Sequence, residues 1–142
     1  MKAKEYLQQY KYLEEQKMSL IERMRAIDKD VASIGGTNYG DRVQSSPKND
    51  PIGEIVIELI KKKSTIGLKL TEVRAKQLVI ENLLANVSDT QPKFYRVLVH
   101  RYIMGDDWKT ICCDMDISRG EANRLHGKAL LFFEQNVLNN KK

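Results

Sequence analysis

Two long stretches of the chain repeat their apolar residues at alternating steps of four and three. In the first stretch the repeating positions are Tyr6, Tyr10, Leu13, Lys17, Leu20, Met24, Ile27, Val31 and Ile34. In the second they are Ile52, Val56, Leu59, Lys63, Ile66, Leu70, Val73, Gln77, Ile80, Leu84 and Val87. This spacing places a narrow apolar seam along an α-helix. The sequence therefore predicts two long helices, of which the second is the longer.

The segment between the two repeats, residues 35–51, is rich in turn-forming residues and has little to bury. We expect it to be an exposed linker. If the chain reverses there, the helices form an antiparallel, coiled-coil-like hairpin in which paired residue numbers add up to about 86, with Tyr10 opposite Gln77 or its neighbour. A parallel intermolecular coiled coil is the alternative, although two Tyr and a Lys in the first seam are unfavourable for an autonomous zipper.

The second helix has a wider apolar surface than one seam requires. The apolar residues outside its seam are Ile55, Ile60, Leu78, Val79 and Leu83. We expect part of this helix to pack against something besides the first helix, and the hairpin offers a surface for a homodimer.

The net charge, the positions of the cysteines and the hydropathy limit the kinds of protein that this chain can be. The chain of 142 residues has 24 Lys and Arg against 19 Asp and Glu, a net charge of +5 that favours a polyanionic partner only weakly. Cys112 and Cys113 are adjacent, so they match neither an ordinary disulfide nor a zinc site, and they suit a reducing compartment. Since no apolar stretch is long enough to span a membrane and the polar start does not resemble a signal peptide, we expect a cytoplasmic protein with no membrane partner.

The last third of the chain predicts three shorter helices. The first should run from Thr90 to Met104, capped by the polar residues at 88–90, with Pro92 in its first turn and Gly105 at its end. Asp106 or Asp107 should cap the second, which carries inward-facing residues. These are Trp108, Ile111 and Cys112.

A turn at 115–117 should lead into the last helix. Ser118 and Glu121 form a capping-box pair at its start. Its inward face is Ala122, Leu125, Ala129, Leu130 and Phe133, and residues 139–142 should fray. Two helices joined by a short turn in this way are typical of a DNA-reading helix-turn-helix, in which the second helix enters the major groove.

Polar and basic side chains lie on the outward face of that last helix. The predicted base-reading residues are Arg119, Gly120, Asn123 and Arg124. The predicted phosphate-binding residues are Arg101, Lys109, Ser118 and Lys128. Arginine can pair bidentately with guanine and asparagine with adenine, whereas lysine suits phosphate. The competing interpretation is a solvated helix face with no ligand.

The stretch 101–130 resembles the fourth conserved region of bacterial sigma-70-type factors. The matching positions are Gly105, Trp108, Ile111, Cys112 where alanine is common, Ser118-Arg119, and Lys128-Ala129-Leu130. The whole chain, with Arg42-Val43-Gln44-Ser45-Ser46-Pro47 in its linker, is similar to small prophage proteins of Gram-positive bacteria akin to the ArpU and RinA late transcription regulators. The resemblance implies a DNA-binding domain and control of phage late genes, with RNA polymerase as an alternative partner.

The resemblance has limits within the chain. Arg119-Gly120-Glu121 stands where sigma factors that read the upstream promoter element usually have an Arg-Glu-Arg run, so the target sequence does not transfer. No segment resembles the sigma region that melts DNA, which excludes a complete sigma factor. A regulator that shares only the sigma-type DNA reader fits better.

Other chemistry-bearing residues give weaker signals. His100 and His126 lie outside any Cys/His metal spacing, so we expect solvent or phosphate contacts for them and no metal or cofactor. Trp108 is expected at a helix junction, Cys112 as a buried apolar group and Cys113 further outward. With neither a Gly-rich phosphate loop nor a nucleophile elbow nor a persuasive acid pair, we expect neither an enzyme nor a small-molecule substrate.

We therefore predict an all-α protein with two domains. Residues 1–87 form the helical hairpin, a candidate dimerisation arm, and residues 88–142 form a compact sigma region-4-like helix-turn-helix domain. The predicted function is sequence-specific binding of double-stranded DNA in transcriptional regulation. The alternatives are an interaction module that binds RNA polymerase or another regulator, and a coiled-coil phage assembly protein.

Overall fold

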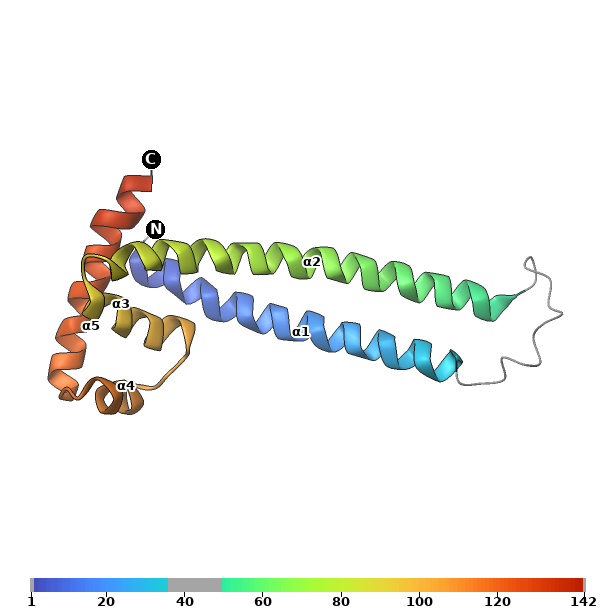
Figure 1. The fold of residues 1–142 in the computed structure, drawn as a ribbon, viewed down its shortest axis with the longest axis horizontal. Helices are drawn as coiled ribbons and strands as arrows, with labels where there is room; N and C mark the ends of the chain where they lie inside the picture. Colours follow the sequence, from blue (N-terminus) through green and yellow to red (C-terminus); the bar gives the residue numbers. More distant parts are fainter. Residues whose placement is uncertain (1, 36–49, 142) are drawn as a thin grey trace. The chain divides into compact units, whose positions relative to one another are not determined.

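The computed structural model describes residues 2–35 and 50–141, and within these ranges it contains helices and no strand (Figure 1). The predicted all-α class is confirmed. Most of the linker predicted at 35–51 lies outside the described residues. None of the described helices combines the length and the apolar character that crossing a bilayer requires.

The two long helices occupy the two predicted stretches. Helix α1 spans Ala3–Gly35 and helix α2 spans Pro51–Ser88, with 33 and 38 residues, so the second is the longer as predicted. The start of α2 is capped by Asp50, whose Oδ1 accepts a hydrogen bond from the Gly53 amide at 3.1 Å. Pro51 occupies the first helical position, where its missing amide hydrogen costs nothing.

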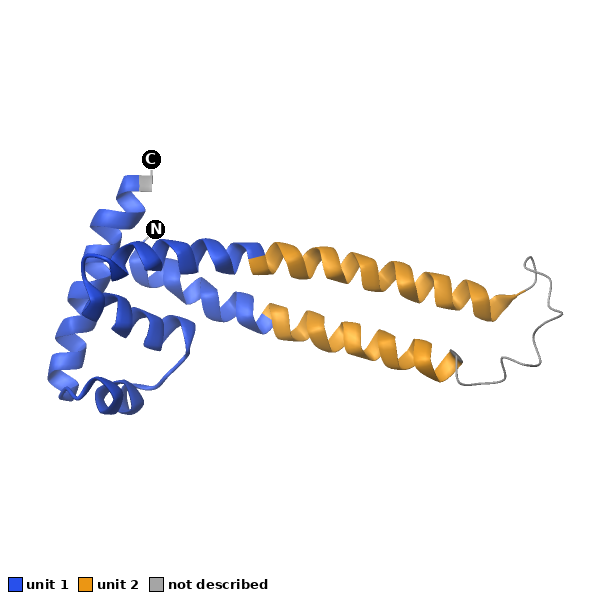
Figure 2. Ribbon diagram, in the orientation of Figure 1, with its two compact units in different colours: residues 1–15, 75–142 blue, residues 16–74 orange. Residues whose placement is uncertain are grey.

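The chain divides into two compact units (Figure 2). Unit 2 comprises residues 16–74 and contains parts of α1 and α2. Its buried apolar residues are the seam residues Leu20, Ile27, Ile66 and Val73. Lys63 donates a hydrogen bond to Asp28, which links the two helices across this unit. The seam predicted from periodicity is therefore the buried face here.

Unit 1 comprises residues 1–15 and 75–142. In it Gln77 is completely buried and donates a hydrogen bond from Nε2 to Glu14 Oε2 at 2.7 Å. The residue numbers of Glu14 and Gln77, like those of Asp28 and Lys63 in unit 2, add up to 91. The pairing of Tyr10 with Gln77, for which the expected sum is about 86, stays a prediction.

One hydrophobic core holds unit 1 together. It combines residues from the start of α1, the end of α2 and every helix that follows. Its buried members are Ala3, Leu7, Tyr10, Ile80, Leu84, Val87, Val97, Leu98, Tyr102, Ile111, Ala129, Phe133 and Val137. The core thus spans the expected boundary at 87/88, and the domains 1–87 and 88–142 remain a prediction.

The C-terminal helices are short and close together in sequence. Helix α3 spans Pro92–Leu98 and continues as the π-helical segment η3, Val99–Ile103. Helix α4 spans Trp108–Met115 and α5 spans Arg119–Phe133. The chain then forms the π-helical segment η4, Glu134–Leu138, and the 3-10 turn η5, Asn139–Lys141.

Two details at the start of α3 and the end of the chain correct the predictions. Helix α2 extends to Ser88, whose hydroxyl donates to the Ala85 carbonyl inside that helix instead of capping α3. The N-cap of α3 is Gln91, which makes no side-chain capping hydrogen bond, although Pro92 does occupy the first turn. At the other end, residues 139–141 form the turn η5 where fraying was predicted.

Candidate nucleic-acid interface

Helices α4 and α5 are joined by a tight turn with defined caps at both ends. Asp107 caps α4 by accepting a hydrogen bond from the Thr110 amide at 2.8 Å. The hydrogen bonds from Thr110 hold the pKa of the Asp107 carboxyl below its usual range. Helix α4 ends at Asp116, whose backbone is left-handed with φ 54°, and the Ile117 amide bonds to the Cys112 carbonyl at 3.1 Å. The predicted turn at 115–117 is confirmed.

Ser118 caps α5, as the capping-box pattern predicts. Its Oγ accepts a hydrogen bond from the Glu121 amide at 3.2 Å. Of the predicted inward residues of α5, Ala122, Ala129 and Phe133 are completely buried. Leu125 and Leu130 are half-buried and pack against the core of unit 1. The inner face of α5 therefore anchors it to that core, and its opposite face remains accessible.

That accessible face carries the predicted base-reading residues. Arg119, Gly120, Asn123 and Arg124 are all exposed within the first two turns of α5. A Cβ built at Gly120 would meet only the Arg124 guanidinium, at 3.8 Å. The predicted phosphate-binding residues Lys109, Ser118 and Lys128 are exposed as well, whereas Arg101 is half-buried.

Trp108 positions two of these cations. The guanidinium of Arg101 lies 5.0 Å from the centre of the Trp108 ring and that of Arg119 lies 5.4 Å from it. Both distances fall within the range of cation–π attraction. Arg101 also donates to the Asp106 carbonyl at 3.2 Å. The indole therefore lies at the helix junction, as predicted, and restrains the side chain at the first position of α5.

His126 packs against Tyr102 and Trp108 inside the protein, so the solvent or phosphate contact predicted for it is wrong. Its Nε2 lies 2.8 Å from the Tyr102 phenol oxygen, and its ring meets the Trp108 ring edge-on at 4.9 Å. Burial, reinforced by the positive charges of Arg101 and Lys4, lowers the pKa of His126 to about 4. The imidazole is therefore neutral near pH 7. Burial raises the pKa of Tyr102, while Arg101 acts in the opposite direction.

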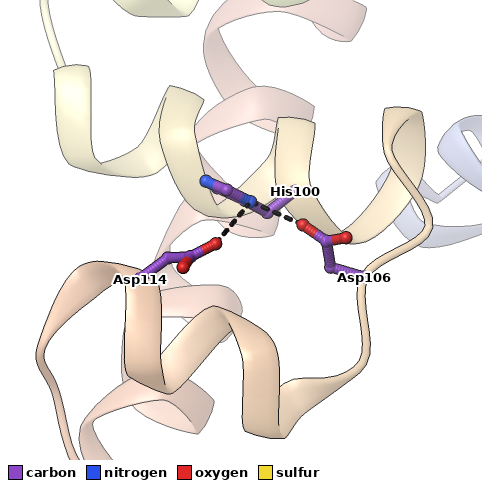
Figure 3. Close-up of side chains that lie close together, drawn as sticks. All are labelled: His100, Asp106 and Asp114. Carbon is purple, nitrogen blue, oxygen red and sulfur yellow. Dashed lines mark hydrogen bonds and ion pairs between the residues drawn. The ribbon is translucent and has the colours of Figure 1, made fainter.

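His100 also has partners within the protein. Its Nδ1 lies 2.7 Å from Oδ2 of Asp106 and 3.9 Å from Oδ2 of Asp114 (Figure 3). His100 comes from η3, Asp106 from the loop before α4, and Asp114 from the last turn of α4. One ligand atom from each of the three lies within 4.8 Å of the others, so this cluster has the donor atoms of a cation site. Sequence spacing missed it because the residues match no familiar metal motif.

The remaining candidate features are the cysteines and two grooves in unit 1. Cys112 is half-buried, where full burial was predicted, and Cys113 is exposed; both are free thiols. A groove of about 470 Å³ is lined by Tyr6, Gln9, Tyr12, Leu13, Lys76, Val79 and Ile80. A second, of about 450 Å³, is lined by Leu7, Gln8, Tyr10, Lys11, Glu14 and residues 101–105. Neither groove includes the outward residues of α5.

Comparison with known protein families, with curated proteins and with solved structures gives no significant match.

Proposed function

We propose that the protein binds double-stranded DNA in a sequence-specific manner and regulates transcription. In this proposal α4 and α5 form a helix-turn-helix, and α1 and α2 form an antiparallel hairpin. The observation that carries the proposal is the exposed set of polar and basic side chains on the first turns of α5, a helix whose opposite face packs against the core of unit 1. A recognition helix needs this combination of a rigid inner face and long polar side chains near its N-terminus.

In this proposal one set of residues contacts the bases of the DNA and another set contacts its phosphates. Arg119, Asn123 and Arg124 would reach base edges in the major groove, and Gly120 would allow the backbone to approach closely. The cation–π contact with Trp108 reduces the number of orientations that Arg119 can adopt before it binds. Lys109, Ser118 and Lys128 would contact phosphates on either side.

Arg101 fits a supporting role better than that of a mobile phosphate anchor. Its guanidinium is already engaged by the Asp106 carbonyl and the Trp108 ring. A residue held in this way would contribute to DNA binding mainly through its positive charge. Its contact with Trp108 would also help to hold the indole in place against Arg119.

The sequence resemblance to sigma region four and to ArpU- and RinA-type regulators supports control of phage late genes in the bacterial cytoplasm. A protein that carries this reader without the other sigma regions would place itself on DNA and act through its effect on polymerase. Its partners would then be double-stranded DNA and, through that DNA, RNA polymerase.

A homodimer is the second part of the proposal, and it is supported by exposed apolar residues of α2 in unit 2. Ile57, Ile60 and Leu68 are 55%, 54% and 71% exposed. They share one face of the helix, because their spacings of three and eight residues are close to whole turns. Burying such a stripe against a second copy would give the two-fold arrangement with which dimeric readers contact two half-sites.

The experiment that tests DNA binding uses the full-length protein, because the core of unit 1 includes residues from α1. A binding site is first selected from a random duplex pool, and affinities are then measured by fluorescence anisotropy at several salt concentrations. Arg124→Ala should reduce the preference for the selected site by about 1–3 kcal/mol. Lys128→Ala should weaken all duplexes similarly and lower the salt slope.

Two outcomes would contradict the proposal. Failure to select any sequence, with no salt-dependent retention of duplex DNA, would exclude DNA binding. Equal effects of Arg124→Ala and Lys128→Ala on all duplexes would exclude the proposed division between base and phosphate contacts. Retention of RNA polymerase in the absence of DNA would instead favour an interaction module.

A further inference from the structure

We propose that His100, Asp106 and Asp114 form a binding site for a divalent metal ion of the zinc type. The cluster provides one imidazole nitrogen and two carboxylate oxygens from three separate elements (Figure 3). A set of three nitrogen and oxygen ligands with an open fourth position is common among protein sites for Zn²⁺. This inference is independent of the proposed function.

The distances lie close to those that coordination requires. Ligand atoms bound to one tetrahedral ion at about 2.1 Å lie roughly 3.4 Å from one another. His100 Nδ1 is 2.7 Å from Asp106 Oδ2 and 3.9 Å from Asp114 Oδ2, so one separation is shorter and the other longer than this value. The two separations would have to change by about 0.7 and 0.5 Å to reach this value, and the ligand atoms of Asp106 and Asp114 lie within 4.8 Å of each other.

Burial and charge also favour a cation. The side chains of His100 and Asp106 are only 14% and 22% exposed, whereas that of Asp114 is 48% exposed. Two carboxylates close together repel each other unless a cation lies between them. Because the Asp114 carboxylate is the most exposed of the three side chains, an ion could reach the cluster from that side.

Two arginines donate hydrogen bonds to the main chain of the carboxylate ligands. Arg101 donates to the main-chain carbonyl of Asp106 at 3.2 Å, and Arg96 donates to that of Asp114 at 3.0 Å. In many metal sites, hydrogen bonds from residues that do not bind the metal help to orient the residues that do. These bonds hold the main chain from which the Asp106 and Asp114 side chains project.

The test is a zinc titration of the full-length protein after treatment with a chelator. Isothermal titration calorimetry should show one Zn²⁺ per chain, and the ion should raise the melting temperature. Asp114→Asn should weaken zinc binding at least about tenfold. The same variant should leave the metal-free melting temperature almost unchanged, because Asp114 lies beyond hydrogen-bond distance from His100 at 3.9 Å.

Asp116→Asn is the matched control, since it removes an exposed carboxylate two residues away and asparagine tolerates the left-handed backbone at that position. Its zinc affinity should equal that of the wild type. Because Cys112 and Cys113 are free thiols nearby, Co²⁺ spectra are recorded as well. Absence of binding, equal affinities of the two variants, or a thiolate-to-cobalt charge-transfer band would each overturn the assignment.

Discussion

The Nε2 atom of His126 lies 2.8 Å from the phenol oxygen of Tyr102, and the two rings stack with their centroids 5.7 Å apart. Tyr102 belongs to η3 and His126 to the middle of α5. The pair therefore links α5 to η3 through a polar contact between the buried Tyr102 ring and the half-buried His126 ring. It helps to determine the orientation in which α5 presents its outward side chains.

The lowered pKa of His126 predicts a loss of stability in mild acid. The folded protein holds the pKa near 4, below the ordinary value of 6.5, so only the unfolded chain takes up the proton between these two pH values. The resulting stabilisation is complete above pH 6.5 and is lost as the pH falls toward 4. Since the ring is only half-buried, we expect a contribution of about 1–2 kcal/mol.

Urea unfolding at a series of pH values, with wild type and His126→Phe compared at each, measures this contribution. Other carboxyl groups titrate in both proteins, so only the difference between them reports on His126. The wild-type advantage should shrink from pH 7 toward pH 4. A difference that stays constant over this range would show that the imidazole is not kept neutral by the fold.

The two glycines Gly105 and Gly127 should respond to alanine with opposite signs. Gly105 ends η3 with φ +72°, where a Cβ is strained, so Gly105→Ala should lower the free energy of unfolding by about 1 kcal/mol. Gly127 lies inside α5 with open space around its Cα, so Gly127→Ala should raise it by about 0.5–1 kcal/mol. Denaturant titration followed by circular dichroism measures both. Equal signs would contradict the assigned backbone conformations.

Leu7 should matter for the C-terminal helices although it lies in α1. Its side chain is completely buried in the core shared with Ile111 and Phe133, so Leu7→Ala should cost about 2–5 kcal/mol. The single tryptophan, Trp108, reports on the α4 region by fluorescence. Leu131→Ala, at a residue that is 56% exposed and lies outside the proposed dimer surface, is the control and should change stability by less than about 0.5 kcal/mol. An unchanged Trp108 transition in Leu7→Ala would exclude the shared core.

The contact between Trp108 and Arg119 should contribute to DNA affinity. Trp108→Leu removes the cation–π attraction and should weaken binding of the selected duplex by about 1 kcal/mol, or roughly fivefold. The same substitution in an Arg119→Ala protein should have a smaller effect, because its partner is already absent. Thermal melting checks that both proteins fold. Equal losses in the two backgrounds would show that Trp108 does not act through Arg119.

Local features of the fold were predictable because their causes lie within a few residues. The seam repeat predicts α1 and α2, the acidic residues at 106–107 include the cap of α4, and Ser118 with Glu121 marks the start of α5. The exposure of the basic face of α5 follows equally from its inward residues. The binding roles of that face stay predictions.

Contacts between distant segments were not predictable in the same way. A four-three repeat looks the same after a shift of one turn, so the repeat by itself does not specify a contact between the helices such as that of Glu14 with Gln77. His126 meets Tyr102 across 24 residues, and this requires knowledge of how α5 packs. The same holds for His100, Asp106 and Asp114, which only the loop before α4 brings together.

The hydrogen bond from the Ala3 amide to Glu134 Oε2, at 3.5 Å, joins positions 131 residues apart in the chain. A ribosome that adds about 5–20 residues per second needs roughly ten seconds to cover this interval. During that time Leu7 and Tyr10 have emerged from the ribosome without the partners that bury them in the finished core. The start of α1 therefore remains without its full core until α5 and η4 have been synthesised, and unit 1 can close only after that point.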